Sequence, residues 1–224
     1  MAYANRYSLL VDIDGTILIN KPRKNRVLRH MLGENIDDTF CNSFSISKPS
    51  LGGGDINRDE FNKLFYSGRF LDEDVPYESA AEVLTEESKR SDIIYVTARH
   101  HNQENGDSMR EGTLDWMRKN EFPVPDNGGV EILMIPFRDM DLRMMGMKRG
   151  KEKIVEKVSK ERKIIGAVGD LPHDAEVYCK YGLRTFILRQ PNHSEQEYNI
   201  YGQVVFVSDW REIKARLDEA YKSL

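Results

Sequence analysis

Two aspartates, at positions 12 and 14, follow an apolar run and precede a glycine and a threonine. Alternate side chains of an extended strand share a face, so Asp12 and Asp14 are expected to project together while the extended geometry lasts. Gly15 lets the backbone turn directly afterwards. Two adjacent carboxylates repel each other and call for a divalent cation, a shared proton, or both. The pattern predicts a magnesium-assisted phosphoryl-transfer site, against the alternative of an ordinary polar turn.

Two later apolar runs also end in polar side chains. The first ends at Thr97, and the second ends at Asp170, with Asp174 four residues further on. Both runs are nearly unbroken in apolar residues, as expected of strands that are covered on both faces. Ligands of open parallel sheets lie outside the carboxyl ends of the strands. We therefore expect Asp12, Thr97 and Asp170 to face one crevice.

The order of these motifs is Asp-x-Asp-Gly-Thr, a threonine, a lysine and Gly-Asp-x-x-x-Asp. It resembles the haloacid dehalogenase-like hydrolase superfamily, most of whose members are phosphatases. The resemblance covers residues 8–188, although the stretch after the first motif matches no family motif. It implies an enzyme that hydrolyses phosphomonoesters. For the family's lysine, Lys151 at the start of a predicted helix fits the spacing best, and Lys148 is the alternative.

The resemblance implies a role for each matched carboxylate. Asp12 would be the nucleophile that forms an aspartyl-phosphate. Asp14 would be the acid and base, with its pKa raised by the neighbouring Asp12. Magnesium would be bound by the side chains of Asp12 and Asp170 and by the main-chain carbonyl of Asp14, an oxygen-only set that suits Mg²⁺. Asp174 would support this shell by hydrogen bonds or through a water.

The residues after the second strand are expected to contact the substrate. Thr97 and the backbone N–H of Ala98 would hold phosphoryl oxygens. Arg99, His100 and His101 follow directly and should face the same crevice. For the two histidines, contact with the ester and an exposed loop remain open alternatives. A metal role is not expected for them, because no partner ligand lies at suitable spacing.

Predicted strands and helices alternate, which indicates an α/β fold, a Rossmann-like parallel sheet flanked by helices. The expected strands span residues 7–11, 93–97, 130–135, 164–168, 184–188 and 204–207. The expected helices span residues 77–90, 109–120, 151–160, 174–181 and 209–221.

Residues 18–76 are too many for an ordinary loop. We interpret them as a small, mostly helical cap, with helices over 28–32 and 58–65, inserted into a catalytic core formed by residues 1–17 and 77–224. In the resembled superfamily such a cap closes over the site and selects the substrate. The alternative is a rigid packing appendage. A glycine triplet at 52–54 is expected to flex during closure.

Composition narrows the classes of partner. The chain has 224 residues, a formal net charge of -4 and a pI of about 5.8, so no global basic field attracts nucleic acid or anionic membrane. We expect neither a membrane span nor a secretory signal. Two cysteines form no disulfide framework and fit a reducing, cytoplasmic setting.

The sequence favours a small phosphorylated metabolite or nucleotide as substrate, and it predicts no oligomeric state. The runner-up is a nucleic-acid 3′-end phosphatase, because residues 97–99 and 112–117 resemble the phosphatase half of polynucleotide kinase-phosphatases. Basic residues at 21–29 would then follow a phosphate backbone, although a solvated surface also explains them. A non-catalytic binding protein of the same fold is poorly supported, because Asp12, Asp14 and Asp170 are all present.

Overall fold

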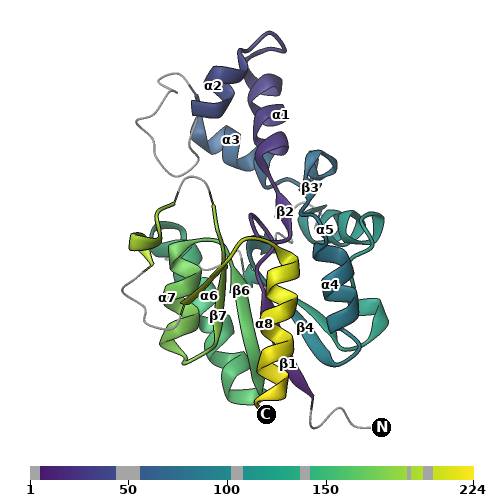
Figure 1. The fold of residues 1–224 in the computed structure, drawn as a ribbon. Helices are drawn as coiled ribbons and strands as arrows, with labels where there is room; N and C mark the ends of the chain where they lie inside the picture. The colour runs from purple at the N-terminus through teal and green to yellow at the C-terminus, as the bar shows by residue number, and fades with distance from the viewer. Residues whose placement is uncertain (1–5, 44–55, 102–107, 137–141, 191–192, 199–203) are drawn as a thin grey trace.

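The structure is a computed structural model, and it describes residues 6–43, 56–101, 108–136, 142–190, 193–198 and 204–224. Six parallel strands form the central sheet (Figure 1). In spatial order they are β5 (Val130–Pro136), β4 (Ser91–His101), β1 (Tyr7–Val11), β6 (Ile164–Gly169), β7 (Thr185–Leu188) and β8 (Val204–Val207). The predicted α/β fold with a parallel sheet is confirmed. β1 lies inside the sheet, between β4 and β6. Asp12 and Asp170, which directly follow β1 and β6, therefore come to the same edge of the sheet, and Thr97 lies in the neighbouring β4.

Helices cover both faces of the sheet. One face carries α4 (Ala80–Glu87), α5 (Ser108–Lys119) and α8 (Trp210–Lys222), and the other carries α6 (Leu142–Glu161) and α7 (Pro172–Lys180). Leu9 and Val11 of β1 pack toward the first set, whereas Leu10 packs toward the second. Because alternate side chains of this strand enter two different cores, residues 9–11 are all apolar. Short 3₁₀ helices span Pro125–Asn127 (η2) and Glu195–Glu197 (η3).

Residues 20–74, hereafter the insert, lie between two short strands that pair antiparallel, β2 (Leu18–Ile19) and β3 (Val75–Pro76). The insert contains α1 (Lys21–Leu32), α2 (Asp38–Ser43), α3 (Arg58–Phe65) and η1 (Leu71–Glu73). It has an apolar core of its own, made of Val27, Leu28, Cys41, Phe61, Phe65 and Phe70. Figure 1 shows the insert at the end of the molecule opposite the two termini.

Two helices are longer than the sequence predicted. α1 begins at Lys21 rather than at residue 28, and Pro22 occupies its first turn, where a missing N–H leaves no bond unmade. α6 begins at Leu142 rather than at residue 151, so Gly150 lies inside a helix. A Cβ at that glycine would come within 2.6 Å of Ile135 Cδ1. Gly150 therefore permits close approach between α6 and β5.

The glycine triplet at 52–54, which we expect to flex during closure, lies outside the described residues. In the described part of the chain, no helix is both long and apolar enough to cross a membrane. Cys41 and Cys179 are free thiols, as the sequence predicted.

Candidate active site

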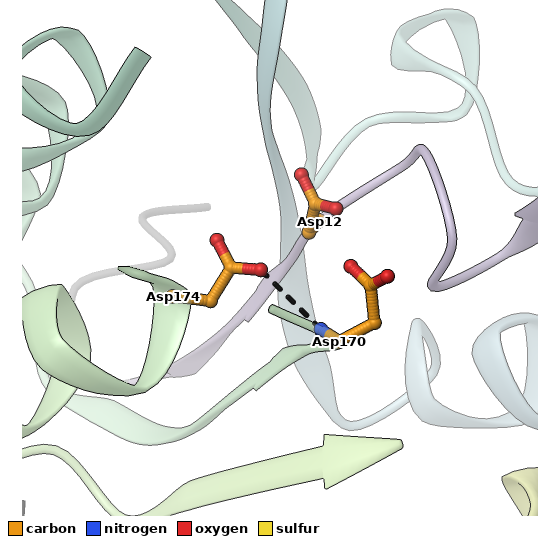
Figure 2. Close-up of side chains that lie close together, drawn as sticks. All are labelled: Asp12, Asp170 and Asp174. Carbon is orange, nitrogen blue, oxygen red and sulfur yellow. Dashed lines mark hydrogen bonds between the residues drawn. The ribbon is translucent and has the colours of Figure 1, made fainter. Parts of the chain in front are cut away.

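Three buried carboxylates meet at the carboxyl edge of the sheet. Asp12 follows the last residue of β1, and Asp170 follows the last residue of the adjacent β6. Asp174 lies in the first turn of α7. One oxygen from each of the three side chains lies within 4.8 Å of the others. Figure 2 shows the three side chains close together.

Gly15 brings the first motif close to Asp170. Its φ of 84° lies in the left-handed region, where side chains other than hydrogen are strained. A Cβ there would come within 2.1 Å of Asp170 Oδ2. The glycine of the Asp-x-Asp-Gly-Thr motif is therefore required both by the turn and by the carboxylate that faces it.

Side chains from distant elements hold the backbone of this turn. Gln190 Nε2 donates to the carbonyl of Gly15 at 2.8 Å. Trp210 Nε1, at the start of α8, donates to the carbonyl of Thr16 at 2.9 Å. These bonds keep the turn after β1 in one geometry, so the position of Asp12 depends on packing from the far end of the chain.

Lys151 is the lysine that lies at the site. Its Nζ is 2.6 Å from Asp12 Oδ1 and 2.5 Å from Asp174 Oδ1, and its side chain is buried. The competitor, Lys148, is half exposed and pairs with Glu176. Lys151 lies within α6 and not at its start, so the predicted start of this helix was wrong.

Burial and neighbouring charges shift the pKa values of the carboxylates at the site in different directions. Burial raises the pKa of Asp12 to about 7, although the Lys151 ammonium opposes this. Burial, together with the charges of Asp12 and Asp174, raises the pKa of Asp170 well above its ordinary value. For Asp174 the Lys151 charge outweighs burial and lowers the pKa. The pKa of Lys151 itself is raised, because the carboxylates of Asp12 and Asp174 outweigh its burial.

The donor set fits a hard divalent cation. Three buried carboxylates face one ammonium group, which leaves an excess of negative charge that a cation would balance. The donors are oxygen atoms, the type that magnesium prefers. The Thr16 hydroxyl lies 3.2 Å from Asp12 Oδ2 and 3.4 Å from Asp170 Oδ1, so it orients one or the other carboxylate.

Asp174 also holds the backbone after β6. Its Oδ2 accepts from the N–H of Asp170 at 3.3 Å, drawn in Figure 2, and from the N–H of Leu171 at 3.1 Å. An acidic side chain in the first turn of a helix is stabilised by the free N–H groups there. Gly169 leaves the room for it, since a Cβ there would lie 2.6 Å from that of Asp174. The position suits the supporting role expected of Asp174 and also places an oxygen beside Asp12.

An irregularity in β4 follows Thr97. The pairing of β4 with β5 runs from Ile93 to Thr97 and resumes at His100, so Ala98 and Arg99 have no partner in the ladder. Such bulges redirect side chains next to active sites. Thr97 is buried, and its Oγ1 accepts from the N–H of Arg99 at 3.1 Å. The side chains of His100 and His101 lie outside the described part of the structure.

Asp14 is held by two arginines, and this was not predicted. Arg99 binds it through Nε and Nη2 at 2.7 and 2.9 Å, and Nη2 of Arg23 in α1 lies 2.6 Å from its Oδ1. Burial alone would raise the pKa of Asp14, but the two guanidinium groups outweigh it and hold the pKa well below the ordinary value. The expectation that Asp12 raises the pKa of Asp14 was therefore wrong, because the nearer charges are positive.

Several residues at the site were missed by sequence reasoning. Arg23 was assigned to a basic surface cluster, yet it is fully buried. Asp74 lies 3.1 Å from Arg23 and 3.4 Å from Arg99 and had no sequence signal at all. Thr113 accepts from Arg99 Nη1 at 2.8 Å and lies in a segment whose resemblance was noted without a role. Thr16 was part of the first motif, and only the fold shows what its hydroxyl contacts.

Comparison with known proteins supports the fold and not a sequence family. No family model matches the chain, and no curated protein matches its sequence. Several solved structures match nearly the whole length. The chain has the haloacid dehalogenase-like fold. A haloacid dehalogenase-like hydrolase from Streptococcus pneumoniae is 11% identical with a TM-score of 0.57, over 94% of this chain and 98% of that one.

Two further solved structures match the fold of this chain. A predicted phosphatase from Clostridium acetobutylicum is 11% identical with a TM-score of 0.62, over 96% of this chain and 99% of that one. A hydrolase of the haloacid dehalogenase family from Deinococcus radiodurans is 15% identical with a TM-score of 0.56, over 97% of each chain. Identities this low support a shared haloacid dehalogenase-like fold, and the function has to be argued from the site.

Proposed function

We propose that this protein is a magnesium-dependent phosphomonoester hydrolase that works through an aspartyl-phosphate on Asp12. The observation that carries the proposal is the buried cluster of Asp12, Asp170 and Asp174 around Lys151, at the carboxyl edge of a haloacid dehalogenase-like sheet. The Deinococcus radiodurans structure of this fold contains bound phosphate and sodium, an anion and a cation of the kinds this site would accommodate.

In the first step an oxygen of the Asp12 carboxylate attacks phosphorus, and the bond from phosphorus to the alcohol oxygen breaks. Lys151 favours the ionised, nucleophilic form of Asp12 and so opposes the effect of burial, since its Nζ lies 2.6 Å from Oδ1. Thr97 and the N–H of Ala98 would donate hydrogen bonds to the phosphoryl oxygens. Magnesium, held by the carboxylates of Asp12 and Asp170 and the carbonyl of Asp14, would neutralise charge that develops on the transferring phosphoryl group.

Asp14 would handle the protons. It would protonate the departing oxygen and then accept a proton from the water that hydrolyses the aspartyl-phosphate. With Arg23 and Arg99 bound to it, Asp14 is ionised, the form that the second step needs. The first step needs the protonated form, so in this mechanism the arginine contacts loosen when a substrate binds.

The insert would act as the cap. Its residue Arg23 reaches the core residue Asp14, so a change in the position of the insert would alter the surroundings of the acid and base. The paired strands β2 and β3 carry the chain between the two parts and would serve as the hinge. We place the core at residues 1–17 and 77–224 and the cap at residues 18–76.

Phosphate release from a panel of small phosphomonoesters tests the proposal, with magnesium and with EDTA. Asp12→Asn is the decisive variant, because it removes the nucleophile while keeping the side-chain shape. We expect metal-dependent release by the wild type and a loss of at least about a thousandfold in the variant, as for nucleophiles that act within a set of catalytic groups.

Thermal unfolding of Asp12→Asn provides the control, since an unfolded variant would be inactive for a trivial reason. Lys148→Met is a matched variant outside the site and should keep its activity. Substantial turnover by a folded Asp12→Asn protein would show that the nucleophile is misassigned, and release that is insensitive to EDTA would remove the role of the metal.

A further inference from the structure

Four charged side chains meet where the insert touches the core. Arg23 and Asp74 come from the insert, and Asp14 and Arg99 come from the core. Asp14 receives hydrogen bonds from both arginines, and Asp74 lies 3.1 Å from Arg23 Nε and 3.4 Å from Arg99 Nη2. This arrangement joins the two parts of the molecule directly beside the site.

Burial is unequal within this group. The side chains of Arg23, Arg99 and Asp74 are essentially inaccessible, whereas 24% of the Asp14 side chain is exposed. Asp14 is therefore the member that faces the open side of the site. The two guanidinium groups lie directly behind its carboxylate.

Arg23 is incompletely satisfied. Its Nη1 has no hydrogen-bond partner among the described residues, and its Nε is near Asp74 without the alignment of a hydrogen bond. Its guanidinium carbon lies 4.1 Å from the centre of the Phe65 ring, which fixes its plane. A rigid, buried guanidinium with unused donors is prepared for a further acceptor.

The hydrogen bonds that Arg23 and Arg99 lose when a substrate binds indicate what that acceptor is. This step rests on the proposed function, in which Asp14 contacts the departing oxygen of the substrate. When it does so, its oxygens can no longer serve both arginines, and a buried guanidinium left without a partner is strongly destabilising. Burial also raises the pKa of Asp74 to about 7, against the pull of both arginines, so near neutral pH it balances their charge only in part. An anionic group on the substrate would restore the balance.

We propose that Arg23 and Arg99 form a second anion subsite, which binds a carboxylate or a second phosphate on the leaving alcohol. The preferred substrates are then phosphomonoesters whose alcohol part carries its own negative charge close to the ester. The insert contributes Arg23, and the core contributes Arg99, so such a substrate bridges the two parts of the molecule.

Three esters with the same three-carbon spine test this in the wild-type protein. They are propyl phosphate, 3-(phosphonooxy)propanoate and 1,3-propanediol bisphosphate. We expect kcat/KM for at least one anionic ester to exceed that for propyl phosphate by about tenfold or more, as expected of a hydrogen bond between charged groups. The two anionic arms distinguish a carboxylate from a phosphate. Equal values, or a preference for propyl phosphate, would overturn the subsite.

Arg23→Gln should erase most of this preference. Arg23 also contacts Asp14, so its replacement affects turnover of every ester. The readout is therefore the ratio of kcat/KM for the favoured anionic ester to that for propyl phosphate, which we expect to fall about tenfold or more. Arg26→Gln is the matched control, because Arg26 lies one turn further along α1 and pairs at the surface with Glu34. Equal losses on all three esters would assign Arg23 a structural role and contradict the proposal.

Binding measurements separate this inference from the proposed function. Calorimetry with the Asp12→Asn protein reports the affinity for each ester without turnover, so it does not depend on folding of the Arg23 variant. Tighter binding of an anionic ester, with no phosphate release by the wild type, would uphold the subsite and reject the hydrolase. Release without any binding preference among the esters would do the reverse.

Discussion

Lys151 carries the positive charge that lies against both Asp12 and Asp174. In Lys151→Met these carboxylates would remain buried without that partner, so we expect the metal-free protein to lose about 3–5 kcal/mol of unfolding free energy. Lys148→Met removes a half-exposed ion pair and should change it by less than about 1 kcal/mol. Urea unfolding in EDTA measures both variants. Equal stabilities for the two would mean that Lys151 does not compensate the carboxylates.

Asp12 also predicts a pH dependence. Because burial raises its pKa from 3.8 to about 7, the folded metal-free protein holds a proton that the unfolded chain has lost. Its contribution therefore lowers stability as the pH rises from about 4 to about 7. Magnesium binds the ionised carboxylate, so its affinity should rise with pH across this window, by up to about tenfold per unit for each proton displaced.

Calorimetric magnesium titrations between about pH 6 and about pH 8 measure this dependence. In Asp12→Asn the affinity should be lower and its pH slope shallower, with Asp170 providing the remaining dependence because its pKa is also raised. A wild-type affinity that is constant over this range would contradict the ligand assignment of Asp12.

At the scale of elements, the contact between α6 and β5 positions Lys151. Gly150 precedes this lysine and faces Ile135, and a Cβ at Gly150 would lie 2.6 to 2.8 Å from three atoms of that side chain. Replacing an exposed glycine in a helix by alanine usually stabilises the protein by roughly 0.5–1 kcal/mol. Here we expect Gly150→Ala to destabilise the protein by about 1–3 kcal/mol, because the clash overpacks the core.

A double-mutant cycle isolates the cause. In an Ile135→Ala background the clash is removed, so Gly150→Ala should become neutral or stabilising there. Thermal or urea unfolding of the four proteins measures the coupling. If alanine at position 150 is equally harmful in both backgrounds, the close approach of α6 to β5 is not the reason for the glycine.

At the scale of the whole molecule, the charge of the protein favours small substrates over nucleic acid. The net charge is -4, and Arg23, one of the basic residues between 21 and 29, is buried at the site rather than on a surface. Raising NaCl from about 50 to about 200 mM should therefore change kcat/KM for small esters by less than about tenfold, far from the thousandfold or more of proteins that hold many backbone phosphates.

The same assay with a 3′-phosphorylated oligonucleotide provides the comparison. We expect no preference for it over a small ester at low salt. A strong preference that disappears as salt rises would favour the nucleic-acid end phosphatase over the metabolite hydrolase.

The local pattern of apolar and polar residues was sufficient to predict the parallel sheet and most of the acidic cluster. Unbroken apolar runs indicate strands covered on both faces, and side chains that directly follow such strands must lie at one edge of a parallel sheet. The prediction that Asp12, Thr97 and Asp170 share one site rests on that basis, and the structure brings Asp12 and Asp170 together. Lys151 could be ranked above Lys148 by its spacing, whereas the start of its helix was predicted nine residues too late. Gly150, which precedes Lys151, lies inside α6 and faces β5.

Only the tertiary structure decided the surroundings of Asp14. Arg23 is nine residues along the chain from it, Arg99 is 85 away, and they converge on it from different elements. The pKa of a carboxylate depends on the charges within a few ångströms, which local spacing does not reveal. The motif by itself therefore identified the acidic residues, whereas packing of the insert against the core determined that Asp14 is ionised and that two buried arginines stand behind it.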